Sequence, residues 1–181
     1  MIILLSLLCS AFFSGMEIAY VSSNRLNLEI EKKQKGLIPK ILSIITKDPS
    51  RFISTMLIGN SFALVIYGLF MGQFIIDYLS FLFSPSMNEL TVLLLQTIIS
   101  TLLILIAAEF IPKVLFQIYS NFSMKIFSIP AYIFYIILYP VTGLVIIISN
   151  FILKTFFKVN TDDSEFSFSK VELENYIENE I

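Results

Sequence analysis

Three long apolar runs dominate the chain, and each is long enough to cross a lipid bilayer as a helix. They cover residues 1–23, 52–79 and 90–111, and about 20 apolar residues span the hydrocarbon core. Apolar residues are continuous in these runs rather than alternating with polar ones, which is typical of spanning helices and not of barrel strands. The pattern predicts an all-α integral membrane fold with three transmembrane helices per protomer.

A fourth apolar stretch, residues 126–153, has a different pattern. Pro130 and Pro140 divide it into short pieces, and each proline removes a helical hydrogen bond and kinks the chain. Lys154 and Lys158 follow it directly, which favours an exit on the cytoplasmic side. We therefore expect a kinked juxtamembrane belt helix rather than a fourth crossing, and a transmembrane domain that covers residues 1–158.

The polar segments set the expected orientation. Residues 24–51 carry a cluster of basic side chains, at Arg25, Lys32, Lys33, Lys35, Lys40, Lys47 and Arg51. By the positive-inside rule this segment is cytoplasmic, which places the N-terminus outside. Within it, the chain up to Gly36 and the segment 39–46 are predicted to form two amphipathic helices at the inner membrane face.

The remaining polar segments agree with that orientation. The loop 80–89 has no basic residue, so we expect it outside. Residues 159–181 are acidic, and the capping-box pattern Ser169-Lys170-Val171-Glu172 predicts one short helix there. We expect this linker to lead into further cytoplasmic domains, with the C-terminus in the cytoplasm of a multi-pass protein of the cell membrane.

Composition narrows the function. The chain is 56% hydrophobic and 14% charged, against about 25% charged in soluble domains. It has no histidine and one cysteine, Cys9, which excludes His-based zinc sites, Ser-His-Asp triads and thiolate clusters. The spans hold no aspartate pair of the kind an intramembrane protease needs, and no basic footprint suits a nucleic acid. We expect a protein that is not an enzyme.

Each predicted span carries a polar group in its cytoplasmic half. Glu17 lies eight residues before Arg25, and Asn60 lies nine residues after Arg51, so both sit roughly 12–14 Å from their basic flanks. Glu109 lies four residues before Lys113. Carboxylates within a membrane are costly and are functional candidates by default.

Neighbouring residues extend these three positions. Ser14 is three residues before Glu17 and shares its helix face. Gly15 and Gly59 permit close approach, and Ser61 adds a hydroxyl beside Asn60. In α-helical spacing, Pro112 leaves the carbonyl of Ala108 free to bind a cation. Oxygen-only ligation suits magnesium or calcium rather than zinc or copper.

Structural readings of the same residues stay open. Glu109 and Lys113 have the spacing of a local ion pair. Asn60 could form a hydrogen bond between helices. Ser14 could form a hydrogen bond to the backbone of its own helix. Gly68 and Gly72 form a G-x-x-x-G pair that suits either packing within one protomer or a dimer contact.

Three ordered motifs carry a family resemblance over about residues 1–155. They are Ser14-Gly15-Met16-Glu17-Ile18-Ala19 followed by Ser23-Asn24-Arg25-Leu26, then Leu57-Ile58-Gly59-Asn60, then Glu109-Phe110-Ile111-Pro112-Lys113. Together they resemble the transmembrane domain of the CNNM/CorC family of magnesium transporters.

The resemblance implies a homodimer that exports Mg²⁺, with Na⁺ entry as a candidate driving force, from a pocket open to the cytoplasm. Ser14, Asn60 and Glu109 match motif positions expected at the ion site, and Glu17 matches the family's acid as ligand or neighbour. Ala108 and Ser61 depart from the residues that many members have there, Gly and Asn. The tandem CBS domains that follow in the family lie outside this sequence, so a nucleotide partner is implied only through them.

Two functions fit these features. The first is a magnesium transporter embedded in the lipid bilayer. The second is a membrane ion sensor or anchor that does not transport and instead governs attached cytoplasmic domains, because a binding site need not be a pathway.

Overall fold

The computed structural model describes residues 1–82, 88–153 and 155, and within them it contains helices and no strand. The predicted all-α membrane fold is confirmed. The helices are α1 (Ile2–Ser22), α2 (Arg25–Lys32), α3 (Leu37–Ile45), α4 (Pro49–Leu82), α5 (Glu89–Leu103), the π-helix η1 (Ile104–Phe110), α6 (Ile111–Ile118), α7 (Ser120–Ile126), α8 (Ser128–Ile137) and α9 (Tyr139–Ile152). The chain divides into two units, residues 1–142 and 143–181, and the packing below concerns the first.

Three helical runs of the described chain are long and apolar enough to cross a membrane: Ile2–Ser22, Pro49–Tyr78 and Leu90–Ile118. The count becomes four if α8 and α9 are taken together as one broken span. The third run continues to Ile118, past the predicted end at residue 111, because the helix passes through Pro112 without stopping. The acidic tail 159–181 lies outside the described residues.

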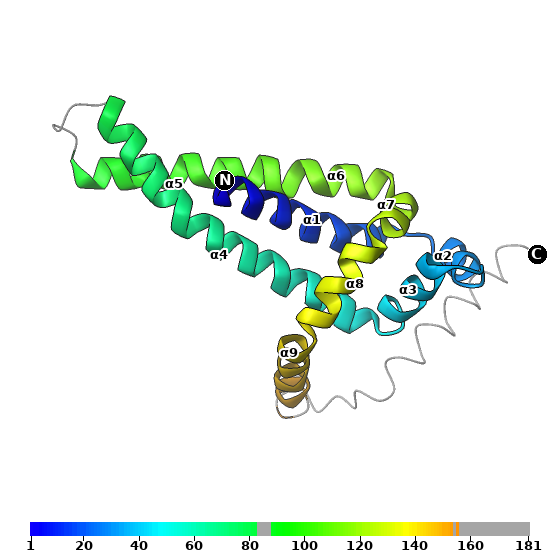
Figure 1. Cartoon of the computed structure of the whole chain (residues 1–181). Helices are drawn as coiled ribbons and strands as arrows, with labels where there is room; N and C mark the ends of the chain where they lie inside the picture. Colours follow the sequence, from blue (N-terminus) through cyan, green and yellow to red (C-terminus); the bar gives the residue numbers. More distant parts are fainter. Residues whose placement is uncertain (83–87, 154, 156–181) are drawn as a thin grey trace, which may run out of the picture. The chain divides into compact units, whose positions relative to one another are not determined.

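Helix α1 is the centre of the first unit. It lies between α4 and the continuous run α5–η1–α6, and it packs against α4, η1, α6 and α7 (Figure 1). Its buried side chains Phe13, Met16 and Ala19 join Phe52 and Met56 of α4 in the main apolar core. Close packing from several sides is what positions the polar residues of α1 against the other spans.

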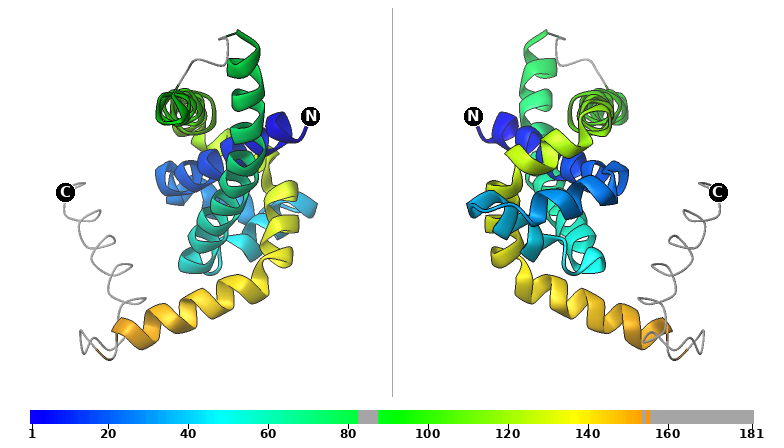
Figure 2. Two further views of the ribbon diagram at one scale, coloured as in Figure 1. Left: turned by 90° about the vertical axis from the view of Figure 1, so that its left-hand side faces the viewer. Right: turned by 90° about the vertical axis from the view of Figure 1, so that its right-hand side faces the viewer.

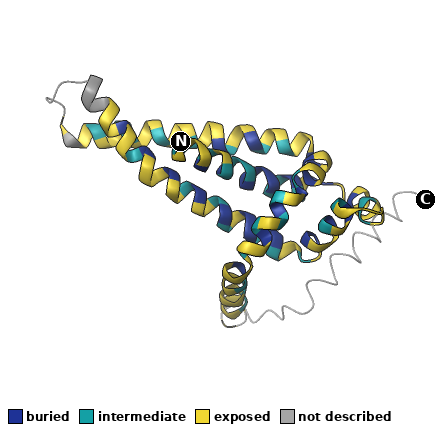
Figure 3. Cartoon of the chain, in the orientation of Figure 1, coloured by how far each residue is buried: buried dark blue, intermediate teal, exposed yellow. Residues whose placement is uncertain are grey.

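The outer faces of the spans are apolar and exposed, as Figure 3 shows in yellow along α4, α5 and α6. Leu94 and Phe110 of the third span are each 64% exposed. A surface this apolar is unfavourable in water and favourable against lipid tails. The burial pattern therefore agrees with a helix bundle surrounded by lipid.

The segment between the first two spans forms two short helices. Asn24 caps α2, because its Oδ1 accepts hydrogen bonds from the backbone N–H groups of Leu26 (2.9 Å) and Asn27 (3.2 Å). Gly36 has a φ of 148°, which favours glycine, and α3 begins directly after it. In both views of Figure 2, α3 (cyan) and α8 (yellow) lie side by side. The predicted location of these helices at the membrane surface stays a prediction.

The stretch predicted as a kinked belt is broken into helices at Phe127 and Leu138. Pro130 and Pro140 each stand in the first turn of the helix that follows a break, where a missing N–H costs nothing. The start of α9 is tied to α4. The Arg51 guanidinium lies 4.3 Å from the ring centre of Tyr139, and the Oγ1 atoms of Thr55 and Thr142 are 3.2 Å apart.

Candidate ion site

Ser14 lies on the buried face of α1, and its hydroxyl has no partner in the described part of the chain. The residue is 0% exposed, and its Oγ makes no hydrogen bond to any described residue. The expected alternative, a bond back to its own helix, is therefore not made. An unpaired hydroxyl inside a bilayer is unfavourable because no water is there to bond it, so a ligand at Ser14 would remove that cost.

Asn60 of α4 is held by Ser10 of α1, which lies one helical turn before Ser14. The Oγ of Ser10 donates a 2.5 Å hydrogen bond to Oδ1 of Asn60. The hydrogen bond between helices that the sequence left open is thus observed, and Ser10 is its donor. An amide oxygen has two lone pairs, so Oδ1 keeps one for a further donor or a cation.

Two glycines bring the spans close together at this level. A Cβ built on Gly59 would lie 2.5 Å from the ring of Phe13, and one on Gly15 would lie 2.7 Å from the ring of Phe116. Both distances are too short for real carbon contacts, so α1 packs against α4 and against α6 only because these positions lack side chains. At both glycines the close approach is made by an aromatic ring.

Glu109 stands on an irregular turn of the third span. It lies half-buried in the π-helix η1, which packs against α1. At the end of η1 the N–H of Ile111 donates to the carbonyl of Ile106, five residues earlier. The α-helical spacing that assigned a free carbonyl to Ala108 therefore does not hold through this turn. Pro112, which has no N–H, is buried directly after it.

The remaining predicted residues lie around this core. Glu17 is half-buried on α1, and Lys113 is half-buried on α6. Within the described residues no ion pair joins Lys113 to Glu109, so the local pair left open by the sequence is not formed. Ser61 is exposed and its hydroxyl donates back to the carbonyl of Leu57 at 3.0 Å, so it does not face α1.

The candidate residues offer a cation mostly neutral oxygen ligands and few carboxylates. The described chain contains no group of three or more His, Cys, Asp and Glu side chains gathered as for a metal. A cation held here would rest on a hydroxyl, an amide oxygen and one or two carboxylates. That donor set is hard and suits Mg²⁺ or Na⁺ rather than a transition metal.

Ser10 and Gln96 are two further polar residues of the spans that the structure places in close contacts between helices. Ser6, Ser10 and Ser14 recur at four-residue intervals on the buried face of α1, and this spacing was the signal for Ser10. Gln96 of α5 packs so closely that a Cβ on Gly72 would lie 2.7 Å from its Nε2, and its Oε1 is buried without a partner among described residues. Its signal was a single amide in the third apolar run.

The G-x-x-x-G pair of α4 is thus split between two environments. Gly72 packs within the protomer, against Gln96. A side chain at Gly68 would meet nothing within 4 Å, so this part of α4 is open on its outer side. Packing within the protomer therefore explains Gly72, whereas it gives no role to Gly68.

A comparison with protein families agrees with this architecture. Residues 1–181, the whole chain, match the family described as the cyclin M (CNNM) transmembrane N-terminal domain. Among curated proteins, no sequence matches the chain. Because the family match extends over every residue, the chain belongs to the CNNM transmembrane-domain family, which is linked to the transport of divalent cations.

Proposed function

We propose that this chain is the membrane domain of a magnesium transporter that exports Mg²⁺ from the cytoplasm, driven by Na⁺ entry. The observation that carries the proposal is the fully buried hydroxyl of Ser14, which has no partner among the described residues. It stands one turn from the bond between Ser10 and Asn60. A polar atom left unpaired at this depth is the expected signature of a site built for a passing ligand.

The proposed ligands come from all three spans. Ser14 supplies a hydroxyl from α1, Asn60 an amide oxygen from α4, and Glu109 a carboxylate from η1. Mg²⁺ loses its water reluctantly and requires negative charge in compensation, which Glu109 provides and Glu17 reinforces three residues from Ser14. With Mg²⁺ released, the same oxygens suit Na⁺.

The irregular turn before Pro112 is the proposed moving part. A π-helical turn has a hydrogen-bond register different from that of the α-helices around it, and such turns often occur at functional sites. Return of η1 to α-helical spacing would rotate Glu109 relative to α1. That rotation would expose the ion to one side of the membrane and then to the other.

Buried hydroxyls beyond the ligands favour transport over ion sensing. Ser10 and Ser6 continue from Ser14 along the same face of α1, towards its N-terminus, and all three are buried. An ion sensor needs a binding site, but it does not need a row of polar groups that leads from the site along the helix. We further propose a homodimer, with the open surface around Gly68 as the candidate contact.

Flux measurements in liposomes test the ligand assignment. Purified protein is reconstituted around a fluorescent Mg²⁺ indicator, and the Ser14→Ala, Asn60→Ala and Glu109→Gln variants are compared with the parent. We expect each variant to slow Mg²⁺ flux about tenfold or more, because each loses a proposed ligand. Ser61→Ala is the matched control, since its exposed hydroxyl bonds only its own helix. Parental flux in all three variants would refute the site.

Binding measured separately distinguishes the transporter from the sensor. Calorimetric titration of the parent with Mg²⁺ reports the site, and flux reports the pathway. Saturable binding that the Glu109→Gln variant weakens, together with flux, supports transport. The same binding without flux, with or without a Na⁺ gradient, would favour the sensor instead.

A further inference from the structure

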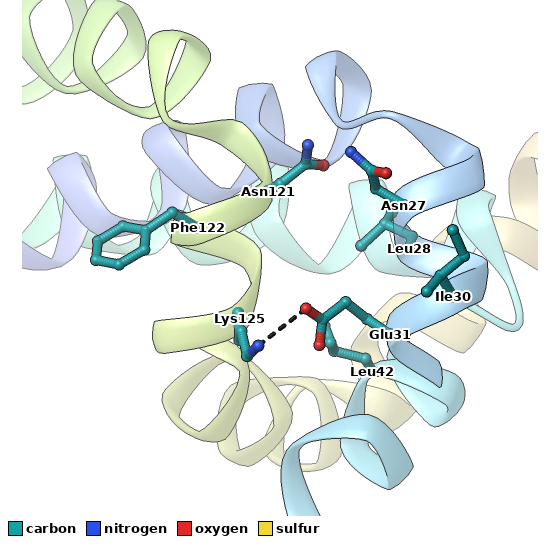
Figure 4. Close-up of a pocket in the computed structure, with 8 residues that line it drawn as sticks. All are labelled: Asn27, Leu28, Ile30, Glu31, Leu42, Asn121, Phe122 and Lys125. Carbon is teal, nitrogen blue, oxygen red and sulfur yellow. Dashed lines mark hydrogen bonds and ion pairs between the residues drawn. The ribbon is translucent and has the colours of Figure 1, made fainter. Parts of the chain in front are cut away.

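A second polar site lies at the end of the bundle, away from the residues discussed above. It is a cavity of about 320 Å³ between α2, α3 and α7 (Figure 4). Helix α2 follows the first candidate span after two residues, and α7 follows the third after one. Two candidate spans therefore end beside the cavity, as is required of a site for lipid headgroups.

Two facing pairs of polar side chains line the cavity. Asn27 and Glu31 stand four residues apart on α2, and Asn121 and Lys125 stand four residues apart on α7, so each pair occupies one helix face. Figure 4 shows the two pairs on opposite sides of the cavity. Oδ1 of Asn121 accepts a hydrogen bond from the N–H of Asn24 at 3.1 Å, which holds this amide in place.

The carboxylate of Glu31 is only half satisfied. Its Oε1 accepts a 2.9 Å bond from Nζ of Lys125. Its Oε2 is shielded from solvent and has no partner among described residues. A buried, unpaired carboxylate oxygen is more costly than any neutral group in the same position. The missing partner is therefore expected to be a donor, and a positively charged one in particular.

The rim of the cavity is apolar and open. Ile30 and Phe122 line it and are 53% and 64% exposed. A purely polar ligand would leave both side chains unused. A ligand with a charged head and a hydrocarbon tail satisfies the interior and the rim together.

We propose that this cavity binds the headgroup of an aminophospholipid, of which phosphatidylethanolamine is the simplest. Its primary ammonium donates to the carboxylate of Glu31, and its phosphate oxygens accept from Nζ of Lys125 and the side-chain amide of Asn121. The acyl chains lie along Ile30 and Phe122. The volume is near the lower end of the range for ligand pockets, about 300–1,000 Å³, and suits a headgroup.

This assignment gives α2 and α7 a shared ligand as well as a shared ion pair. A bound headgroup would fasten together the segments that leave the first and third spans. The lipid would then stabilise the arrangement in which α1 packs against the third span. Binding here uses none of the proposed ion ligands, so its test is independent of flux.

The test compares lipids that differ only at the nitrogen. The full chain, delipidated in detergent, is mixed with phosphatidylethanolamine or with phosphatidylcholine, whose trimethylated nitrogen has no N–H to donate. Thermal unfolding and native mass spectrometry report stability and retained lipid. We expect phosphatidylethanolamine to raise Tm several degrees more than phosphatidylcholine and to be retained at about one copy per chain. Equal effects of the two lipids would overturn the proposal.

Variants assign the effect to Glu31. Glu31→Gln should remove the difference between the two lipids, whereas Glu29→Gln should keep it. Glu29 is on the same helix but pairs with Lys32 and lines a different cavity. If Glu31→Gln does not fold, the charge exchange Glu31→Lys with Lys125→Glu retains the ion pair and should still lose the preference. A preference that survives in the exchanged protein contradicts the assignment.

A competition experiment with the free headgroup distinguishes a lipid ligand from a small soluble metabolite. Free phosphoethanolamine has the same ammonium and phosphate but no chains to contact Ile30 and Phe122. We expect it to compete only at concentrations at least about a hundredfold above those of the lipid, because it buries no apolar surface. Stabilisation by free phosphoethanolamine at equal concentration would show that the ligand is not a lipid.

Discussion

Ser10 donates a 2.5 Å hydrogen bond to Oδ1 of Asn60, and this bond joins the first span to the second. The two residues are fifty positions apart, and Ser10 is fully buried. The bond fixes the orientation of the amide whose other lone pair is the proposed cation ligand. It lies one helical turn from the unpaired hydroxyl of Ser14.

Ser10→Ala should therefore weaken both stability and the proposed ion site. We expect a loss of about 0.6–1.7 kcal/mol in unfolding free energy, the range for hydrogen bonds between membrane helices. A double-mutant cycle with Asn60→Ala in a denaturation titration isolates the pair. Ser61→Ala, on the same helix and exposed, should leave stability unchanged. Additive effects of Ser10→Ala and Asn60→Ala would mean that the bond contributes nothing.

Gly59→Ala should be destabilising for a steric reason. The added carbon would lie 2.5 Å from the ring of Phe13, and overpacking of this kind costs about 1–3 kcal/mol. Gly68→Ala, on the same helix but with nothing within 4 Å, is the control and should be tolerated. Thermal unfolding in detergent measures both. Recovery of stability on adding Phe13→Leu to Gly59→Ala would identify the ring as the cause, and no recovery would point elsewhere.

Pro112→Ala should regularise the third span. Alanine restores an N–H directly after η1 and so permits α-helical spacing through it, whereas proline has no N–H to donate. We expect an unchanged or slightly raised Tm together with Mg²⁺ flux that falls several-fold, because the proposed moving turn is lost. Hydrogen exchange across residues 104–112 should slow in parallel. Unaltered exchange and flux would show that the π-helical turn does not move during transport.

Cysteine labelling tests the orientation predicted from charge. The single cysteine is first removed by Cys9→Ser, and one new cysteine is placed at Lys35 or at Asn88, both exposed. A membrane-impermeant maleimide added to intact cells should label Asn88→Cys and should reach Lys35→Cys only after permeabilisation. The opposite result would place the basic segment outside and reverse the proposed direction of export.

The spans could be predicted from sequence because the bilayer imposes a simple rule. A helix that crosses lipid must be apolar over about 20 residues whatever its neighbours are. The first two runs therefore match α1 and α4 closely. The third predicted run ended at residue 111, because a proline followed by a lysine is typical of the end of a span. Packing of α1 against η1 and α6 instead carries the helix through Pro112 to Ile118.

The sequence proposed the candidate ligands one residue at a time, but it did not give their hydrogen-bond partners. An acid or an amide within an apolar run is visible from sequence alone, and on that ground Glu17, Asn60 and Glu109 were proposed together with Ser14. Which hydroxyl bonds Asn60 depends on how α1 and α4 are rotated about their axes. That rotation is set by Gly59 meeting Phe13 and Gly15 meeting Phe116, contacts between distant segments that periodicity does not encode.

The sequence by itself determined the all-α membrane fold and the three candidate spans, because these follow from the cost of burying polar atoms in lipid. The motifs also sufficed for the family. Only the tertiary structure decided that Ser10 rather than Ser14 bonds Asn60, that Glu109 stands on a π-helical turn, and that α2 and α7 enclose a polar cavity. Hydrogen-bond partners and cavities depend on contacts between distant parts of the chain, and those contacts exist only once the helices pack.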